Sequence, residues 1–162
     1  MLLECGDGGK DWVKLEGMQI TVAHIGGKIP EPWAGLTEEY VRRLGAYAIA
    51  GSQGFRSEAV LVDWMARQKS GPVLVLMDSR GRGMSSEGLA DFVEQHRERG
   101  TRHLVFAIGP ADGWSAGMQE RAGSVLSLGE MTLAHALARL VLAEQLYRAH
   151  TILAGHPYHT GH

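Results

Sequence analysis

Four segments of the chain carry the hydrophobic pattern of β-strands. Residues 18–26 (MQITVAHIG) alternate in polarity and are rich in β-branched side chains, which predicts a strand. Residues 72–77 (PVLVLM) and 103–108 (HLVFAI) are continuously apolar, as are strands covered on both faces of a parallel sheet. Residues 124–128 predict a short last strand, whereas the glycine-spaced residues 45–57 predict no regular element.

Segments with helical spacing separate these strands. We expect helices over residues 33–44, 58–67, 85–99 and 114–122, with Ser57 as the N-cap of the second and Gly100 as the stop of the third. Strands that alternate with helices predict an α/β domain with a parallel sheet and helices on both faces.

The carboxyl ends of the predicted strands are the expected place for a ligand, because ligands of open α/β sheets bind in the crevice there. Three loops qualify on this ground: the loop that follows Met77, residues 109–113 (GPADG) and residues 128–132 (LGEMT). Neither a dinucleotide fingerprint nor a Walker A motif is present. Taken singly, the glycine loop reads equally well as a plain strand-to-helix turn, and Thr132 as the N-cap of a helix.

The apolar helix predicted over residues 133–149 has almost no polar face. Its charges, Arg139, Glu144 and Arg148, do not gather on one side. A helix in a globular protein normally keeps one face polar toward water. We therefore expect this helix to be covered by its own sheet on one side and by a second copy of the chain on the other.

Composition narrows the class of protein. A chain of 162 residues is long enough for one domain, and we expect it over residues 18–162, preceded by a polar leader over residues 1–17. The net charge of -2 argues against a general nucleic-acid binder, and the single cysteine fits a reducing compartment. No apolar run approaches the roughly 20 residues of a membrane span, so we expect a cytoplasmic protein.

The last third of the chain carries an ordered set of motifs. They read Ser127-Leu128, Met131-Thr132-Leu133, His135, Leu137, Arg139, Glu144-Gln145-Leu146-Tyr147-Arg148-Ala149 and His156-Pro157-Tyr158-His159. Near the start, Gly26-Gly27-Lys28-Ile29-Pro30 and Glu39-Tyr40-Val41-Arg42-Arg43 add two more. In this order the motifs closely resemble the RlmH-type methyltransferases of the SPOUT superfamily, and the resemblance runs from Met18 to His159.

The resemblance implies a fold and a cofactor site. The fold is a SPOUT-like parallel sheet with a C-terminal trefoil knot, in a homodimer that builds each site. S-adenosylmethionine would occupy the three loops selected above. The residues carried over to this site are Met77, Gly109, Pro110, Leu128, Gly129, Glu130, Met131, Thr132 and Leu133.

The resemblance also implies an activity, the methylation of N3 of a pseudouridine in 23S ribosomal RNA. Ring N3 lies between two carbonyls and is a weak nucleophile until it loses its proton, so the protein must position the base and favour its anion. His159 is the candidate for orienting or deprotonating the acceptor, and Tyr158 for contacting the base. Arg148 would hold phosphate or stabilise charge on a carbonyl, although a helix-end pair with Glu144 explains it nearly as well. The lack of excess positive charge favours an assembled ribosome as the substrate.

Three departures from the family pattern stand out. Pro110 replaces the second of two adjacent glycines and removes a backbone donor from the loop. Thr160 stands where the family often has a basic residue, and residues 45–57 are short and lack the expected second strand.

Two other functions remain open. The first is a catalytically weak SPOUT module that binds RNA or the ribosome. The second, less favoured, is metal binding by the tail histidines, His150, His156, His159 and His162. No cysteine lies near them and no carboxylate follows Glu144, so a closed zinc site lacks ligands and we predict no metal site.

Overall fold

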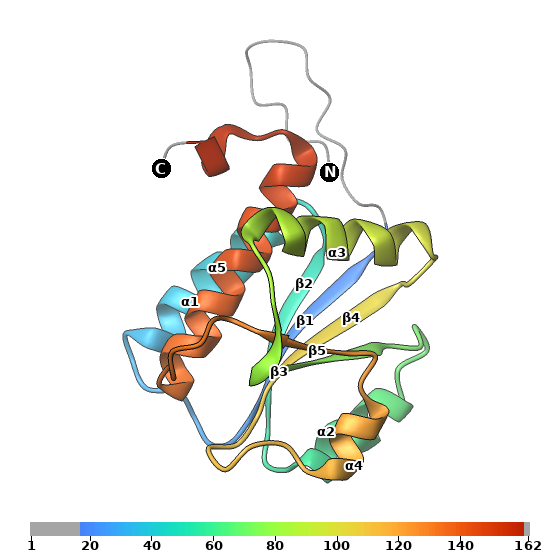
Figure 1. Ribbon diagram of the computed structural model, residues 1–162, viewed down its shortest axis with the longest axis vertical. Helices are drawn as coiled ribbons and strands as arrows, with labels where there is room; N and C mark the ends of the chain where they lie inside the picture. The colour runs from blue at the N-terminus through green and yellow to red at the C-terminus, as the bar shows by residue number, and fades with distance from the viewer. Residues whose placement is uncertain (1–16, 161–162) are drawn as a thin grey trace.

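The computed structural model describes residues 17–160 as a five-stranded parallel sheet between two layers of helices (Figure 1). The predicted leader over residues 1–17 therefore lies, except for Gly17, outside the described residues. The strand order is β2-β1-β4-β3-β5. The strands are β1 (Gln19–Ile25), β2 (Ile49–Phe55), β3 (Val73–Gly83), β4 (His103–Ile108) and β5 (Ser124–Ser127).

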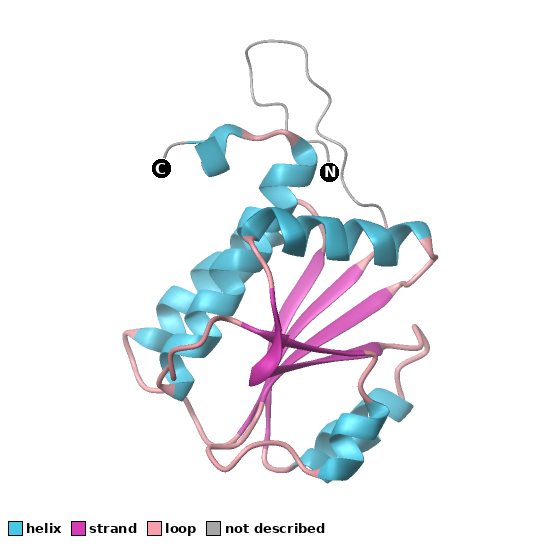
Figure 2. Ribbon diagram, in the orientation of Figure 1, coloured by secondary structure: helices cyan, strands magenta, loops and turns pink. Residues whose placement is uncertain are grey.

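The helices divide between the two faces of the sheet, as Figure 2 shows. One face carries α1 (Trp33–Leu44), α3 (Ser86–Glu98) and α5 (His135–Ala154), and the other carries α2 (Glu58–Ala66) and α4 (Ala116–Arg121). Each layer has its own buried cluster, centred on Leu142 and Phe106 on the first face and on Leu61 and Leu76 on the second. The predicted α/β architecture with helices on both faces is confirmed.

Several element boundaries agree with the hydrophobic pattern. Helix α1 and strand β4 occupy the expected residues, and Ser57 caps α2 by accepting a hydrogen bond from the Val60 amide at 3.3 Å. Gly100 follows α3 with a φ of 82°, in the left-handed region that glycine adopts without strain. Local capping and apolar spacing were sufficient to define these elements.

Strand β2 corrects the expectation that residues 45–57 lack a regular element. It pairs in parallel with β1 residue by residue, from Gln19 opposite Ile49 to Ile25 opposite Phe55. β2 is the edge strand, and among its residues only Phe55 is buried, so its sequence needs no apolar alternation. Pairing with a buried neighbour overrides the weak strand propensity of its glycines and polar residues.

Strand β3 continues beyond its predicted end at Met77 as far as Gly83. Leu126 of β5 is the pairing partner of both Met77 and Arg82, so residues 78–81 bend around β5 between those two positions. At Gly81 a Cβ would lie 2.7 Å from the backbone carbon of Leu126, which shows how closely the two segments pass. The segment after Met77 is thus wrapped against β5 instead of forming an open loop.

Helix α5 is longer than predicted and begins later. It runs from His135 to Ala154, and its N-cap is Ala134, which provides no side-chain hydrogen bond. The reading of Thr132 as an N-cap is therefore wrong. At the other end Gly155 reverses the chain with a φ of 69°, and a 3-10 turn, η1 (Pro157–Thr160), folds back across the end of α5 (Figure 1).

Candidate functional site

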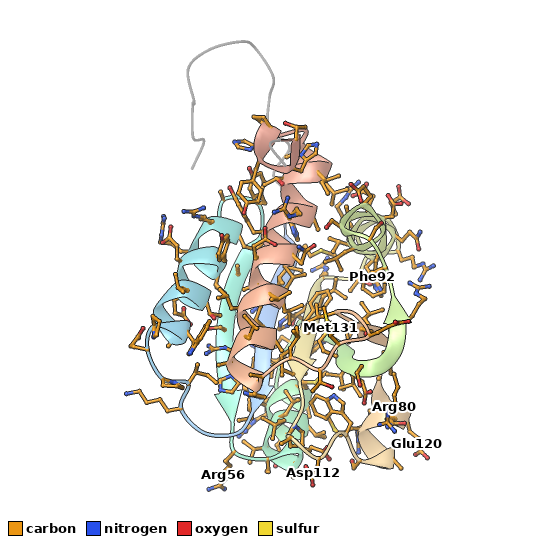
Figure 3. The ribbon with its side chains drawn as sticks, turned by 60° about the vertical axis from the view of Figure 1, so that its left-hand side comes forward. Arg56, Arg80, Phe92, Asp112, Glu120 and Met131 are labelled. Atoms are coloured by element: carbon orange, nitrogen blue, oxygen red, sulfur yellow. The ribbon has the colours of Figure 1, made fainter. Side chains whose placement is uncertain are left out.

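A cavity of about 550 Å³ lies beside residues 77–80 of β3 and beyond the carboxyl ends of β4 and β5. It is lined by residues 77–80, 108–114 and 128–135 without Glu130, and by Ala138. All three loops selected from the sequence therefore meet at one place. Every residue carried over to the cofactor site lines the cavity except Glu130. Figure 3 labels three of the lining residues, Arg80, Asp112 and Met131.

The glycine loop forms a close-fitting wall of this cavity. Trp114 donates its indole N–H to the carbonyl oxygen of Met77 at 3.0 Å, so the loop after β4 is tied to the end of β3. A Cβ on Gly109 would lie 2.7 Å from the Trp114 ring. Glycine at 109 therefore lets the loop and the ring lie this close, and Pro110 lines the cavity next to it.

The loop after β5 forms the opposite wall through backbone groups. Ser127 donates its hydroxyl to the carbonyl of Gly129 at 2.8 Å and accepts from the Gly129 amide at 3.1 Å. Gly129 has a φ of 138°, which side chains rarely permit. Met131 lies beyond it with 82% of its surface exposed, at the rim of the cavity.

Few charged side chains line the cavity, and two of them, Asp78 and Arg80, pair with each other. Arg80 donates to Asp78 at 3.2 Å, and these hydrogen bonds lower the pKa of the Asp78 carboxyl below its usual value. The remaining walls are mostly apolar side chains and backbone, with further polar side chains such as Asp112, Thr132 and His135. Such a cavity suits a ligand with flat or apolar parts and polar edges that meet backbone N–H and C=O groups.

A buried polar cluster that sequence reasoning missed lies beside the first turn of α5. The rings of His24 and His135 are 5.7 Å apart, and Arg139 donates to Ser52 at 3.3 Å with Glu38 at 3.5 Å. Burial, the Arg139 charge and His135 lower the pKa of His24 to about 4. The signal in the sequence was a set of polar residues inside an otherwise apolar strand and helix.

The three residues predicted to act on the acceptor gather at the opposite end of α5. Arg148 donates to Glu144 at 2.5 Å, so the alternative reading of Arg148 as a helix-end partner of Glu144 is confirmed. Tyr158 donates its hydroxyl to the same Glu144 at 3.0 Å, and the Arg148 guanidinium lies 5.0 Å from the Tyr158 ring centre. His159 follows in η1, partly buried.

The structure does not bring this group to the cavity of its own chain. Neither Arg148, Tyr158 nor His159 is among the residues that line the cavity. With a rise of 1.5 Å per residue, the helix places Arg148 about 20 Å from His135 at the cavity wall. The predicted cofactor residues and the predicted acceptor residues are therefore two separate groups within one chain.

The tail histidines that the structure describes make separate contacts. His150 is buried and donates its Nδ1–H to the carbonyl of Leu146 at 2.7 Å, while His156 accepts from the Tyr158 amide at 3.1 Å. Among residues 17–160 no group of three or more histidine, cysteine, aspartate or glutamate side chains could hold a metal ion. His162 lies outside the described residues.

The comparison with known families decides the class of this chain. Residues 18–159 match the model of a family described as predicted SPOUT methyltransferases. The chain belongs to the SPOUT methyltransferase family. The predicted resemblance is thus confirmed over the range in which the motifs occur.

Individual relatives agree with the family. The chain is 48% identical over 146 residues to ribosomal RNA large subunit methyltransferase H of Koribacter versatilis, covering 90% of this chain and 100% of that relative. It is 47% identical over 104 residues to the same-named protein of Allorhizobium ampelinum, covering 64% of each chain. The fold resembles the solved structure of a probable methylase family protein from Haemophilus influenzae, with a TM-score of 0.53, 9% identity, and 91% and 70% of the two chains covered.

No helix among residues 17–160 is both long enough and apolar enough to cross a bilayer.

Proposed function

We propose that this protein is an S-adenosylmethionine-dependent methyltransferase that acts on N3 of a pseudouridine in 23S ribosomal RNA. The observation that carries the proposal is the single cavity formed by the three carboxyl-end loops in a chain of the SPOUT family. Its volume of about 550 Å³ lies within the range of small-molecule sites. The named relatives, which are large-subunit rRNA methyltransferases, support the choice of substrate.

The residues of the cavity fit S-adenosylmethionine. Gly109 allows backbone to approach a flat ring closely, and Leu128, Met131 and Leu133 offer apolar contacts. Backbone groups of the loops at the cavity would meet the polar edges of the ligand. When bound there, S-adenosylmethionine supplies a methyl group already activated by its sulfonium centre. Residues 78–83 are wrapped against β5. We propose that they belong to the loop through which the C-terminal chain threads to form the trefoil knot.

A homodimer would bring the two separated groups together. Leu137, Leu140 and Val141 lie on one stripe of α5 and are only partly buried, and Trp33 and Leu36 of the adjacent α1 are 36% and 45% exposed. A second copy whose α5 runs antiparallel to the first would carry its Arg148, Tyr158 and His159 toward this cavity. Such an interface would also cover the apolar stripe.

The chemistry assigned to the tail follows from the acceptor. N3 becomes nucleophilic when it loses its proton, and His159 is the group that we propose to orient the base or assist that loss. Tyr158 offers an aromatic face and Arg148 a planar cation, which suit a base and a carbonyl or phosphate oxygen. An rRNA substrate places the enzyme in the cytoplasm.

An assembled ribosome suits this chain better than free RNA. Several surface arginines are already paired within the protein, including Arg43 with Glu39 and Arg97 with Glu94. With a net charge of -2, the surface offers little unspecific attraction to phosphate. Recognition would therefore depend on the shape of a structured particle.

Subunit mixing tests the function and the shared site together. His159→Ala should lower methyl transfer to ribosomes that lack the modification by at least about 100-fold, which is the usual contribution of a general acid or base. Gly109→Val should prevent cofactor binding in its own chain. If each site uses two chains, mixing the two inactive variants regenerates one intact site per heterodimer and activity returns. Tritium transfer from labelled S-adenosylmethionine measures both results.

Three outcomes would contradict parts of the proposal. No binding of S-adenosylmethionine to the wild-type protein by calorimetry would leave an RNA- or ribosome-binding module in its place. Normal transfer by His159→Ala would remove His159 from the reaction, and mixed variants that stay inactive would confine each site to one chain.

A further inference from the structure

The carboxylate of Glu144 is the point at which the side chains of the C-terminal end of α5 meet. Its Oε1 accepts from Arg148 Nη2 at 2.5 Å, from Arg148 Nε at 3.1 Å and from the Tyr158 hydroxyl at 3.0 Å. Its Oε2 accepts from Gln145 Nε2 at 2.8 Å. Both oxygens are therefore used, and the side chains of Glu144 and Arg148 are only 17% and 18% exposed.

Glu144 joins two parts of the chain that the turn at Gly155 separates. Arg148 is one helical turn further along α5, whereas Tyr158 is 14 residues away and returns to the helix only after the chain has reversed. The Tyr147 ring lies 4.7 Å from the Tyr158 ring in an edge-to-face arrangement. An ordinary i, i+4 pair would hold Arg148 alone, but this carboxylate also fixes the position of the tail.

The charge states in this group are those that such a network requires. Hydrogen bonding and charge from Glu144 raise the pKa of Arg148, so its guanidinium stays ionised. Burial, followed by contacts with Tyr40 and Glu144, raises the pKa of Tyr158, so its hydroxyl keeps the proton that it donates. Hydrogen bonds that involve an ionised partner are about twice as strong as neutral ones.

The network also reaches the segment that follows β3. Ser86, the first residue of α3, donates its hydroxyl to Gln145 Oε1 at 2.6 Å. Gln145 in turn donates to Glu144. The orientation of Glu144 is therefore fixed from outside its own helix, which gives the carboxylate one position instead of several rotamers.

We propose that Glu144 is a positioning residue for methyl transfer, which holds Arg148 and Tyr158 in one fixed arrangement before the acceptor binds. This inference rests on the proposed function, because it assigns Arg148 and Tyr158 to the acceptor. Glu144 itself touches neither substrate nor cofactor in this role. Loss of its charge releases the Arg148 guanidinium and loosens the tail, while the cavity at the other end of α5 is left intact.

The test compares Glu144→Gln with wild type in the full-length protein. Glutamine has the same shape, and its oxygen still accepts from Tyr158, but its amide donors oppose Arg148. We expect kcat for methyl transfer to ribosomes to fall at least about tenfold, because the reacting groups lose their alignment. The KM and the calorimetric Kd for S-adenosylmethionine should stay within about twofold, since Glu144 is not among the residues that line the cavity.

Glu94→Gln is the matched control, because Glu94 pairs with Arg97 on the surface of α3 and contacts no residue of the tail. It should leave kcat, KM and Kd within about twofold of wild type. The split between kcat and KM is the readout that a general loss of structure would not produce.

Three outcomes would overturn the inference. Normal kcat in Glu144→Gln shows that the arrangement does not depend on the carboxylate. Faster transfer shows that Glu144 withholds Arg148 from the substrate. A parallel loss of S-adenosylmethionine binding and thermal stability shows that Glu144 supports the fold as a whole. In each case the wild type stays active, whereas an inactive wild type contradicts the proposed function itself.

Discussion

The two ends of α5 differ in what they are made of. The end at the cavity is built mostly from backbone, glycines and apolar side chains, with a few polar groups such as the Arg80–Asp78 pair. The wrapped segment after Met77 and the glycine loop at Gly109 form its walls within one chain. The other end is built from charged and aromatic side chains that bind one another around Glu144. The first has the volume of a small-molecule site, and the second is the group of side chains that we propose to act on the acceptor.

This difference has a physical origin. The cavity is shaped by pairing of neighbouring strands, which fixes where β3, β4 and β5 end. The tail is positioned by side-chain hydrogen bonds and ring contacts at the end of a helix. Substitutions at the cavity end should therefore affect folding and cofactor affinity, whereas those at the tail end should affect turnover.

Gly81 should produce the largest effect at the cavity end. In Gly81→Ala the new Cβ would lie 2.7–2.8 Å from the backbone N, C and O of Leu126, and neither segment can move without breaking the pairing of β3 and β5. We expect a loss of about 3 kcal/mol in the free energy of unfolding, the upper part of the usual range for overpacking. Chemical denaturation followed by tryptophan fluorescence measures it.

Gly83→Ala is the control for this prediction. Gly83 belongs to the same wrapped segment, but a Cβ there would meet no atom within 4 Å. We expect little change in stability from it. Equal stability of the two variants would show that residues 78–83 can leave β5 freely, and the cavity end would then be no more rigid than the tail.

Gly109 should give a smaller and more selective effect. In Gly109→Ala the Cβ would lie 2.7 Å from the Trp114 ring, which must shift and weaken its hydrogen bond to Met77. Because the ring can move, we expect the fold to survive with a Kd for S-adenosylmethionine raised about tenfold, equivalent to about 1.4 kcal/mol. Titration calorimetry measures the change.

Gly117→Ala on α4 is the matched control for Gly109. Its Cβ would make only an ordinary contact at 3.9 Å with Ser115, outside the cavity. It should bind S-adenosylmethionine as wild type does. An unchanged Kd in Gly109→Ala would move the ligand away from the glycine loop and remove the contrast between the two ends.

Sequence patterns predicted the elements whose information is local. β4 and α1 follow from continuous apolar residues and helical spacing, and the cap at Ser57 from its side chain. β2 could not be predicted in this way, because its stability comes from pairing with β1, a contact between residues about 30 positions apart. The extension of β3 to Gly83 is likewise fixed by β5 and not by its own residues.

The candidate site also has parts that local sequence predicted and parts that depend on contacts between distant residues. The three loops were predictable because parallel strands end at a common edge, whatever their loops contain. The cluster of His24, His135 and Arg139 was not, since it joins β1 to α5 and each residue alone looks like a misplaced polar side chain. The convergence on Glu144 depended on the turn at Gly155, which sequence spacing does not reveal.

The cluster at His24 predicts an acid sensitivity at the cavity end. Burial is the main cause that lowers the pKa of His24, to about 4, whereas an exposed histidine titrates near 6.5. As the pH falls from 6.5 toward 4, His24 becomes protonated in the unfolded chain but stays neutral in the folded chain. The contribution of neutral His24 to the free energy of unfolding is therefore complete above pH 6.5 and is lost as the pH falls from 6.5 toward 4.

The size of this loss is measurable as a difference between two proteins. Between pH 6.5 and 5.5, His24 should account for about 1 kcal/mol of the fall in the free energy of unfolding. His135, His103 and His150 also have lowered pKa values because of burial. The free energy of unfolding of wild type should therefore fall with pH more steeply than His24 alone would cause. His24→Gln removes only its own share, and urea denaturation at the two pH values should show its curve flatter than wild type by that amount. Parallel curves would mean that His24 takes up its proton in the folded state as readily as in water, and that the cavity end tolerates a buried charge beside Arg139.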